Sequence, residues 1–157
     1  MDKKLPDMGE SLPEVGENSP DMGESLPEID ENLLKMMKRD RFAAYVGMEL
    51  REARPGYALV DMDIEDKHLN GVDMIQGGVI FTLADFAFAA ASNAGGQITV
   101  GIQVSISYLK ASKGKKLKAE AVEVSASQKT VNYKLDVFNE FDEHIAQLTA
   151  IGFHKNS

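Results

Sequence analysis

Alternation of apolar and polar residues is the most frequent pattern in this chain. Together with one short strand-like run, and with weaker alternation in the last segment, it predicts six strands. Residues 48–53 and 57–64 form a pair around Arg54-Pro55-Gly56, and this turn-forming tripeptide predicts a hairpin. Four longer segments follow in the second half of the chain, at 100–108, 117–126, 131–137 and 145–153. In the second of these the alternation slips by one position after Ala121, which predicts a β-bulge.

Two other segments have helical periodicity. Residues 31–45 carry Leu, Met and aromatic side chains among Lys and Arg at helical spacing, which predicts an amphipathic helix. From Gly77-Gly78 to about Asn93 the chain is apolar on almost every face, which is typical of a buried helix. This order of elements favours an α+β architecture, in which a curved antiparallel sheet wraps one long central helix. The sheet would have an exposed edge, which pairing across a dimer would protect.

The first 32 residues follow neither pattern. Residues 6–19 (PDMGESLPEVGENS) and 20–33 (PDMGESLPEIDENL) are two copies of one segment and agree at 11 of 14 positions. This period is too short for a solenoid, and such acidic, proline-containing segments bury too little apolar surface to offset the entropy of ordering. We therefore predict a disordered tail over residues 1–32 and one folded domain over residues 33–157. The tail is either an arm that binds a partner or a solubilising extension.

The net charge of −8 lies entirely in that tail. Residues 1–32 hold 10 acidic residues and 2 lysines, whereas residues 33–157 hold 15 acidic and 15 basic residues. A charge-balanced domain is not typical of a nucleic-acid-binding protein. The absence of Cys excludes disulfides and a Cys nucleophile, and the three His show no metal-ligand spacing. With no secretory signal or membrane-length apolar run, we expect a soluble cytoplasmic protein that binds neither nucleic acid nor membrane.

Asp85 is a carboxylate inside the apolar helix. No Lys, Arg or His lies between Leu69 and Leu109 to neutralise it. Burying an unpaired carboxylate is costly or raises its pKa, and such groups cluster at functional sites. Asp85 is therefore the candidate catalytic residue. The alternative is a carboxylate that faces a gap filled with solvent or bonds to backbone between subunits.

The same helix is predicted to begin at the pair Gly77-Gly78, and Gln76 immediately precedes it. Backbone N–H groups at a helix start are unpaired and carry positive partial charge, and glycine lets a substrate carbonyl approach them closely. These are the components of an oxyanion hole made from main chain. The alternative is an ordinary glycine-rich helix start, just as Asn70-Gly71 is typical of a simple turn.

Five lysines lie within nine residues, beginning at Lys110 and including Lys113. One interpretation is a solvated turn that keeps a sheet edge from pairing. The other is a site for nucleotide phosphates.

The run from Asn70 to Ala89, NGVDMIQGGVIFTLADFAFA, resembles the signature of the hotdog-fold thioesterases of the phenylacetate pathway and of the 4-hydroxybenzoyl-CoA thioesterases. In that signature Asn-Gly, His-Gly-Gly and a helical Leu-Ala-Asp follow one another. The resemblance extends over roughly residues 42–155. It implies a hotdog fold and hydrolysis of an acyl-CoA or aroyl-CoA to the free acid and CoA. CoA would be part of the substrate, with no cofactor and no metal.

Carried over by position, the resemblance implies that Asp85 is the general base or the nucleophile, that the Gly77 amide is the oxyanion donor, and that Asn70 positions the attacking group. It also implies a homodimer with active sites at the interface, where Asp85 faces the loop of the other subunit, and the family commonly forms homotetramers. Lys110 and Lys113 are candidate contacts for the CoA phosphates.

One departure from the common pattern is Gln76, which stands where His is common. One branch of the related 4-hydroxybenzoyl-CoA thioesterases resembles this chain in using Gln. Gln can donate a hydrogen bond but cannot titrate, which disfavours mechanisms that need a His acid or base, including those of the hotdog dehydratases. A non-catalytic hotdog module that binds acyl-CoA or acts as a scaffold is the alternative function. Asp85 argues against it, because nothing structural requires that charge.

Overall fold

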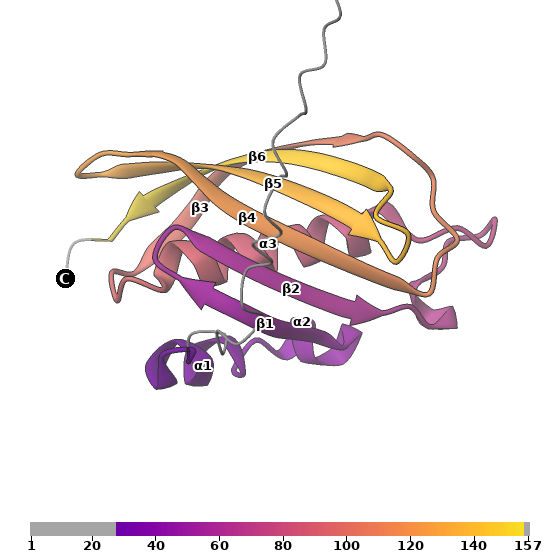
Figure 1. Ribbon diagram of the computed structural model, residues 1–157, viewed down its shortest axis with the longest axis horizontal. Helices are drawn as coiled ribbons and strands as arrows, with labels where there is room; N and C mark the ends of the chain where they lie inside the picture. Colours follow the sequence, from indigo (N-terminus) through magenta and orange to yellow (C-terminus); the bar gives the residue numbers. More distant parts are fainter. Residues whose placement is uncertain (1–27, 156–157) are drawn as a thin grey trace, which may run out of the picture.

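The computed structural model describes residues 28–155. Six strands form one antiparallel sheet in the order β1-β2-β4-β5-β6-β3, and the long helix α3 lies against one face of it (Figure 1). This confirms the predicted α+β architecture of a long helix against a curved antiparallel sheet. The elements are α1 (Glu31–Met37), α2 (Arg41–Val46), β1 (Met48–Arg54), β2 (Tyr57–Asp63), the 3-10 helix η1 (Asp66–His68), α3 (Gly77–Asn93), β3 (Thr99–Tyr108), β4 (Lys116–Ala126), β5 (Thr130–Asn139) and β6 (His144–His154).

The N-terminal helical segment differs from the prediction. Residues 31–45 form two short helices, not one, because Asp40 accepts a hydrogen bond from the Ala43 amide at 2.9 Å and so caps a new helix at Arg41. Asp30 caps α1 in the same way. Helix α1 therefore begins at Glu31, inside the last residues assigned to the tail, while the remainder of the predicted tail up to residue 27 lies outside the described residues.

Register shifts interrupt four of the five strand pairings, and that of β5 with β6 lies between Val137 and Phe138. The register of β4 against β5 shifts between Glu123 and Ser125, two residues beyond the slip that the alternation predicted. Strand β3 shifts against β6 between Gly101 and Gln103, and β1 shifts against β2. Because a bulge increases local twist, these irregularities help the sheet to curve around α3.

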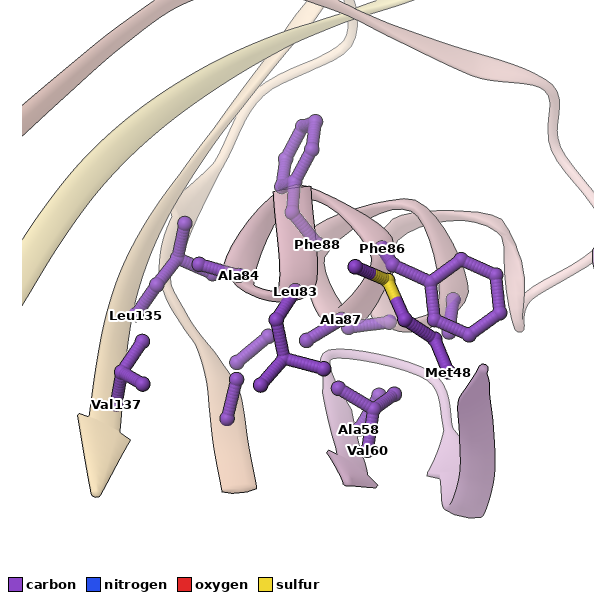
Figure 2. Packing of buried hydrophobic residues seen from close by; sticks show 14 of the residues in the cluster. Met48, Ala58, Val60, Leu83, Ala84, Phe86, Ala87, Phe88, Leu135 and Val137 are labelled. Atoms are coloured by element: carbon purple, nitrogen blue, oxygen red, sulfur yellow. The ribbon is translucent and has the colours of Figure 1, made fainter. Parts of the chain in front are cut away.

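The core lies between α3 and the sheet. Leu83, Ala84 and Ala87 are fully buried, and these small or compact side chains let the helix lie close to the strands. Figure 2 shows Phe86 beside Met48 of β1, and Leu83 directed toward the strand that carries Val60.

The ring of Phe88 packs against the sheet at two glycines. Gly101 of β3 and Gly152 of β6 are opposite one another in the register. A Cβ atom at Gly152 would lie 3.0 Å from Cζ of Phe88, and one at Gly101 would lie 3.3 Å from its Cε1. The ring also meets Tyr133 edge-on, with 5.3 Å between centroids. The missing side chains thus make room for the ring.

One face of α3 is only partly covered by the rest of the described chain. Five residues at intervals of three or four lie on one side of a helix and keep part of their surface exposed: Gly78, Thr82, Asp85, Ala89 and Asn93. Ala87, which is fully buried, points about 160° away from Asp85 around the helix. The prediction of a helix buried on almost every face therefore missed this open face.

The edge strand β3 is also exposed. Its outward side chains include Val100, Ile102 and Tyr108, each more than 40% exposed. An unpaired edge together with exposed apolar side chains is typical of a surface that another chain covers.

No helix within residues 28–155 is both long and apolar enough to cross a membrane.

Candidate functional site

Asp85 is half-buried on the open face of α3. Burial raises the pKa of its carboxyl above the ordinary value, and the negative charge of Asp40 raises that pKa further. No hydrogen bond or positive charge from residues 28–155 opposes this effect. A carboxylate held without a neutralising partner is a better proton acceptor than one in an ion pair, which makes Asp85 suited to act as a base.

The start of α3 offers free backbone donors. The first N–H groups of a helix have no acceptor within it. Those of Gly77 and Gly78 also find none elsewhere among residues 28–155. The Gln76 side chain caps the helix, since its Oε1 accepts a hydrogen bond from the Val79 amide at 3.2 Å. The Gln76 Nε2 group therefore remains able to donate to a ligand.

A cavity of about 330 Å³ opens beside Gly77. Asn70 and Lys110, two further residues predicted for the site, line the same cavity. Ile80, Tyr108 and Leu109 supply apolar surface. The structure thus brings Asn70, Gly77 and Lys110 together, and Asp85 does not line this cavity.

Asp85 and Gly77 of one subunit are too far apart to act on one carbonyl group. They are eight residues apart on α3, and a rise of about 1.5 Å per residue separates them by about 12 Å along the axis. Reacting groups must lie within about 3.5 Å of each other. A site that uses both residues therefore needs Asp85 from a second subunit.

Asn70 organises its own loop. Its side-chain Oδ1 accepts hydrogen bonds from the Val72 amide at 3.0 Å and the Met74 amide at 3.1 Å. These bonds form the turn that the Asn-Gly dipeptide predicted. With its oxygen engaged, the Asn70 side chain has only its NH₂ group available to a ligand.

The lysine cluster is largely neutralised by neighbouring acids. Lys113 and Lys115 make no ion pair with residues 28–155, whereas the other three do. This pairing favours a structural role for most of the cluster and leaves Lys113 as the freer of the two candidate phosphate contacts. The ion pairs are Lys110 with Glu143, Lys116 with Asp61 and Asp63, and Lys118 with Asp142.

His68 joins the two ends of the loop that leads to α3, since it hydrogen-bonds to Glu65 and to Gln76. The sequence did not reveal this role. It is 1% exposed, and its Nδ1 accepts a hydrogen bond from the Glu65 amide at 2.9 Å. Its carbonyl oxygen accepts from the Gln76 amide at 2.9 Å. Burial lowers the pKa of His68, so the ring is neutral near pH 7.

Among residues 28–155 no group of three or more His, Asp or Glu side chains could hold a metal ion.

Tyr108 is the second residue near the site that the pattern of the sequence did not reveal. Its hydroxyl donates a hydrogen bond to the carbonyl oxygen of Gly77 at 3.0 Å. In the sequence Tyr108 is only the last apolar position of an alternating segment. No local signal indicates that the end of this strand meets the start of α3.

The chain is similar in sequence to known proteins. A model of the thioesterase superfamily matches residues 74–146, a span that includes Gly77 and Asp85. The chain is 43% identical over 112 residues to a putative esterase of Archaeoglobus fulgidus, covering 71% of this chain and 73% of that protein. It is 30% identical over 112 residues to the acyl-coenzyme A thioesterase PaaI of Escherichia coli, covering 71% of this chain and 80% of that protein.

Solved structures resemble the fold as well. The E. coli PaaI protein from the phenylacetic acid degradation operon matches with a TM-score of 0.77 at 27% identity, covering 80% of this chain and 92% of that one. A hypothetical thioesterase of Streptococcus pneumoniae, solved with coenzyme A, matches with a TM-score of 0.73 at 26% identity, covering 79% of this chain and 98% of that one.

Proposed function

This chain belongs to the thioesterase superfamily and is a thioester hydrolase, and from that premise we propose that it hydrolyses an acyl-CoA or aroyl-CoA thioester to the free carboxylic acid and CoA. One relative is named an acyl-coenzyme A thioesterase, and a structural neighbour was solved with coenzyme A. Membership of a hydrolase family also disfavours the non-catalytic binding module considered from the sequence.

The observation that carries the proposal is Asp85, a half-buried carboxylate without a neutralising partner among residues 28–155, on the open face of α3. A stable fold gains nothing from such a charge, because its burial is unfavourable. A carboxylate of this kind can serve a hydrolase as a general base.

The active site proposed here combines two subunits. Gly77 of one subunit and Asp85 of the partner subunit lie on either side of the thioester. Two features support this arrangement. The two residues are separated by about 12 Å within one helix, and the chain has both a partly exposed face of α3 and an unpaired sheet edge at β3. A homodimer is the smallest assembly that satisfies both.

In the proposed reaction the carbonyl oxygen of the thioester accepts a hydrogen bond from the Gly77 amide. The N-terminal end of α3 stabilises the negative charge that develops on that oxygen. The partner's Asp85 takes a proton from water while the water oxygen attacks the carbonyl carbon. The C–S bond then breaks, and the CoA thiolate leaves and is protonated.

A second route has the same products. Here the Asp85 carboxylate attacks the carbonyl carbon directly and expels CoA, and water then hydrolyses the mixed anhydride. In either route the NH₂ groups of Gln76 and Asn70 orient the reacting groups by donating hydrogen bonds. Lys113 and Lys110 are the candidate contacts of the CoA phosphates.

The decisive test is Asp85→Asn, which keeps the shape of the side chain and removes the base. We expect kcat to fall at least about 100-fold, the lower range for loss of a general base. Turnover is measured as release of free thiol from a panel of short-chain, long-chain and aromatic CoA thioesters. The matched control is Asp66→Asn, which changes an exposed carboxylate on η1 that does not line the cavity beside Gly77. Wild-type turnover by Asp85→Asn would contradict the mechanism.

A further inference from the structure

We propose that Tyr108 is a positioning residue for thioester hydrolysis, which fixes the peptide of Gly77 at the start of α3 so that the adjacent backbone donors face the substrate. This inference rests on the proposed function of Gly77 as the oxyanion donor. It assigns a role to a residue that is otherwise only the end of an edge strand.

The contact between Tyr108 and Gly77 is close and direct. The Tyr108 hydroxyl donates to the Gly77 carbonyl oxygen at 3.0 Å. A Cβ atom at residue 77 would lie 3.0 Å from that hydroxyl oxygen and 3.1 Å from Cζ. The ring therefore lies against the glycine itself, and a larger residue at 77 would collide with it.

Gln76 confines the pair of glycines from the other side. A Cβ atom at Gly78 would lie only 2.7 Å from Oε1 of Gln76. The same Oε1 accepts a hydrogen bond from the Val79 amide. Gly77 and Gly78 thus lie between a strand residue and a capping residue, and a side chain at either position would require Tyr108 or Gln76 to shift.

Confinement matters here because two glycines in succession have unusual backbone freedom. An oxyanion hole stabilises the transition state only when its donors are fixed before the reaction. The bond from Tyr108 fixes the carbonyl of the peptide that joins Gly77 and Gly78. It also polarises that peptide, and this makes the Gly78 N–H a stronger donor.

Tyr108 is suited to this role because its own backbone is held firmly. It pairs with Ala146 in the register of β3 and β6. The next amide, that of Leu109, donates to the carbonyl of Ile145 at 2.9 Å. The hydroxyl is therefore presented from the sheet and not from a loop. The half-exposed ring also lines the cavity beside Gly77.

The test is Tyr108→Phe, which keeps the ring and removes only the hydroxyl. We expect kcat to fall about 10-fold, the value of one neutral hydrogen bond, while KM changes less than about three-fold. The backbone 1H–15N resonances of Gly77 and Gly78 are expected to shift at unchanged melting temperature. The matched control is Tyr45→Phe, which removes the hydroxyl of an exposed tyrosine on α2.

A kcat within about two-fold of wild type would overturn the inference. So would a loss of kcat that is accompanied by an equal rise in KM and a lower melting temperature, because that result indicates a purely structural role. Asp85→Asn in the same assay separates this inference from the proposed function. Full turnover by Asp85→Asn contradicts the catalytic proposal, whereas unchanged glycine resonances in Tyr108→Phe contradict only the role of Tyr108.

Discussion

At the scale of single residues, Asp85 carries a charge whose burial is unfavourable for folding but which suits the catalytic role proposed for it. Burial raises the pKa of its carboxyl, which means that the folded chain holds the ionised form less favourably than the unfolded chain does. The same desolvation makes the carboxylate a stronger base. A residue with this character is expected to limit the stability of the protein that uses it.

We predict that Asp85→Asn stabilises the protein near pH 7, with a rise in melting temperature of at least about 2 °C. Because the folded pKa lies above the ordinary value of 3.8, wild-type stability falls as the pH rises from 3.8 through the folded pKa. Asn does not titrate, so the advantage of the variant should grow over that window and vanish at lower pH. Thermal melts of both proteins from pH 3 to pH 7 measure the difference, and a variant that is less stable at pH 7 would contradict the prediction.

Residues of the candidate site differ in how far the sequence reveals them. Asp85 was recognisable because a charge interrupts an apolar helix, which is a local signal. The role of Tyr108 was not recognisable, because it depends on the end of β3 meeting the start of α3, and the two are 31 residues apart in the chain. Contacts of this range depend on the packing of whole elements and leave no trace in the periodicity of one segment.

At the scale of elements, α1 is built from the end of the second repeat. Asp30 caps it, Ile29 packs against the core, and Leu33 is 5% exposed. The first repeat has Gly16 and Ser19 where the second has Asp30 and Leu33. The two copies are therefore similar in sequence, but only the second carries the residues that start and anchor this helix.

We predict that Leu33→Ser, which installs the residue of the first repeat, destabilises the protein by at least about 2 kcal/mol through loss of a buried side chain. Met36→Ser is the matched control on the same helix, because Met36 is 39% exposed. Denaturant unfolding monitored by circular dichroism measures both variants. Equal losses would show that burial of Leu33 does not anchor α1.

Periodicity predicted all six strands and the long helix, but it failed where caps and neighbours decide the structure. The amphipathic spacing of residues 31–45 continues through the break, and only Asp40 as a potential cap indicated that a second helix begins there. The open face of α3 escaped detection because Gly78 and Ala89 on that face are as small and apolar as buried residues.

At the scale of the whole molecule, the division of the site between two subunits has a direct test. Asp85→Asn and Gly77→Ala each remove one part of the site, the second by introducing a Cβ atom 3.0 Å from the Tyr108 hydroxyl oxygen. When the two variants are coexpressed, half of the randomly formed dimers are mixed. Each mixed dimer has one site with both defects and one with neither, so about a quarter of wild-type activity should return.

The assay compares the coexpressed pair with each variant alone. If both residues acted within a single subunit, no combination would restore an intact site. Activity no higher than the mean of the two separate variants would therefore contradict the shared site.

The strand order β1-β2-β4-β5-β6-β3, which leaves β3 at the edge, could not be predicted from alternation alone, because alternation identifies strands and not their neighbours.

The facing glycines beneath Phe88 have a consequence for engineering this enzyme. Phe88 follows Asp85 by three residues on the same helix, so the space left by Gly101 and Gly152 affects how closely this part of α3 approaches the sheet. An alanine at residue 152 would crowd Thr99 Cγ2 at 2.6 Å as well as the Phe88 ring at 3.0 Å, so we expect the ring and its segment of helix to shift. A mutational library aimed at altering substrate preference should therefore include these two positions, although neither lines the cavity beside Gly77.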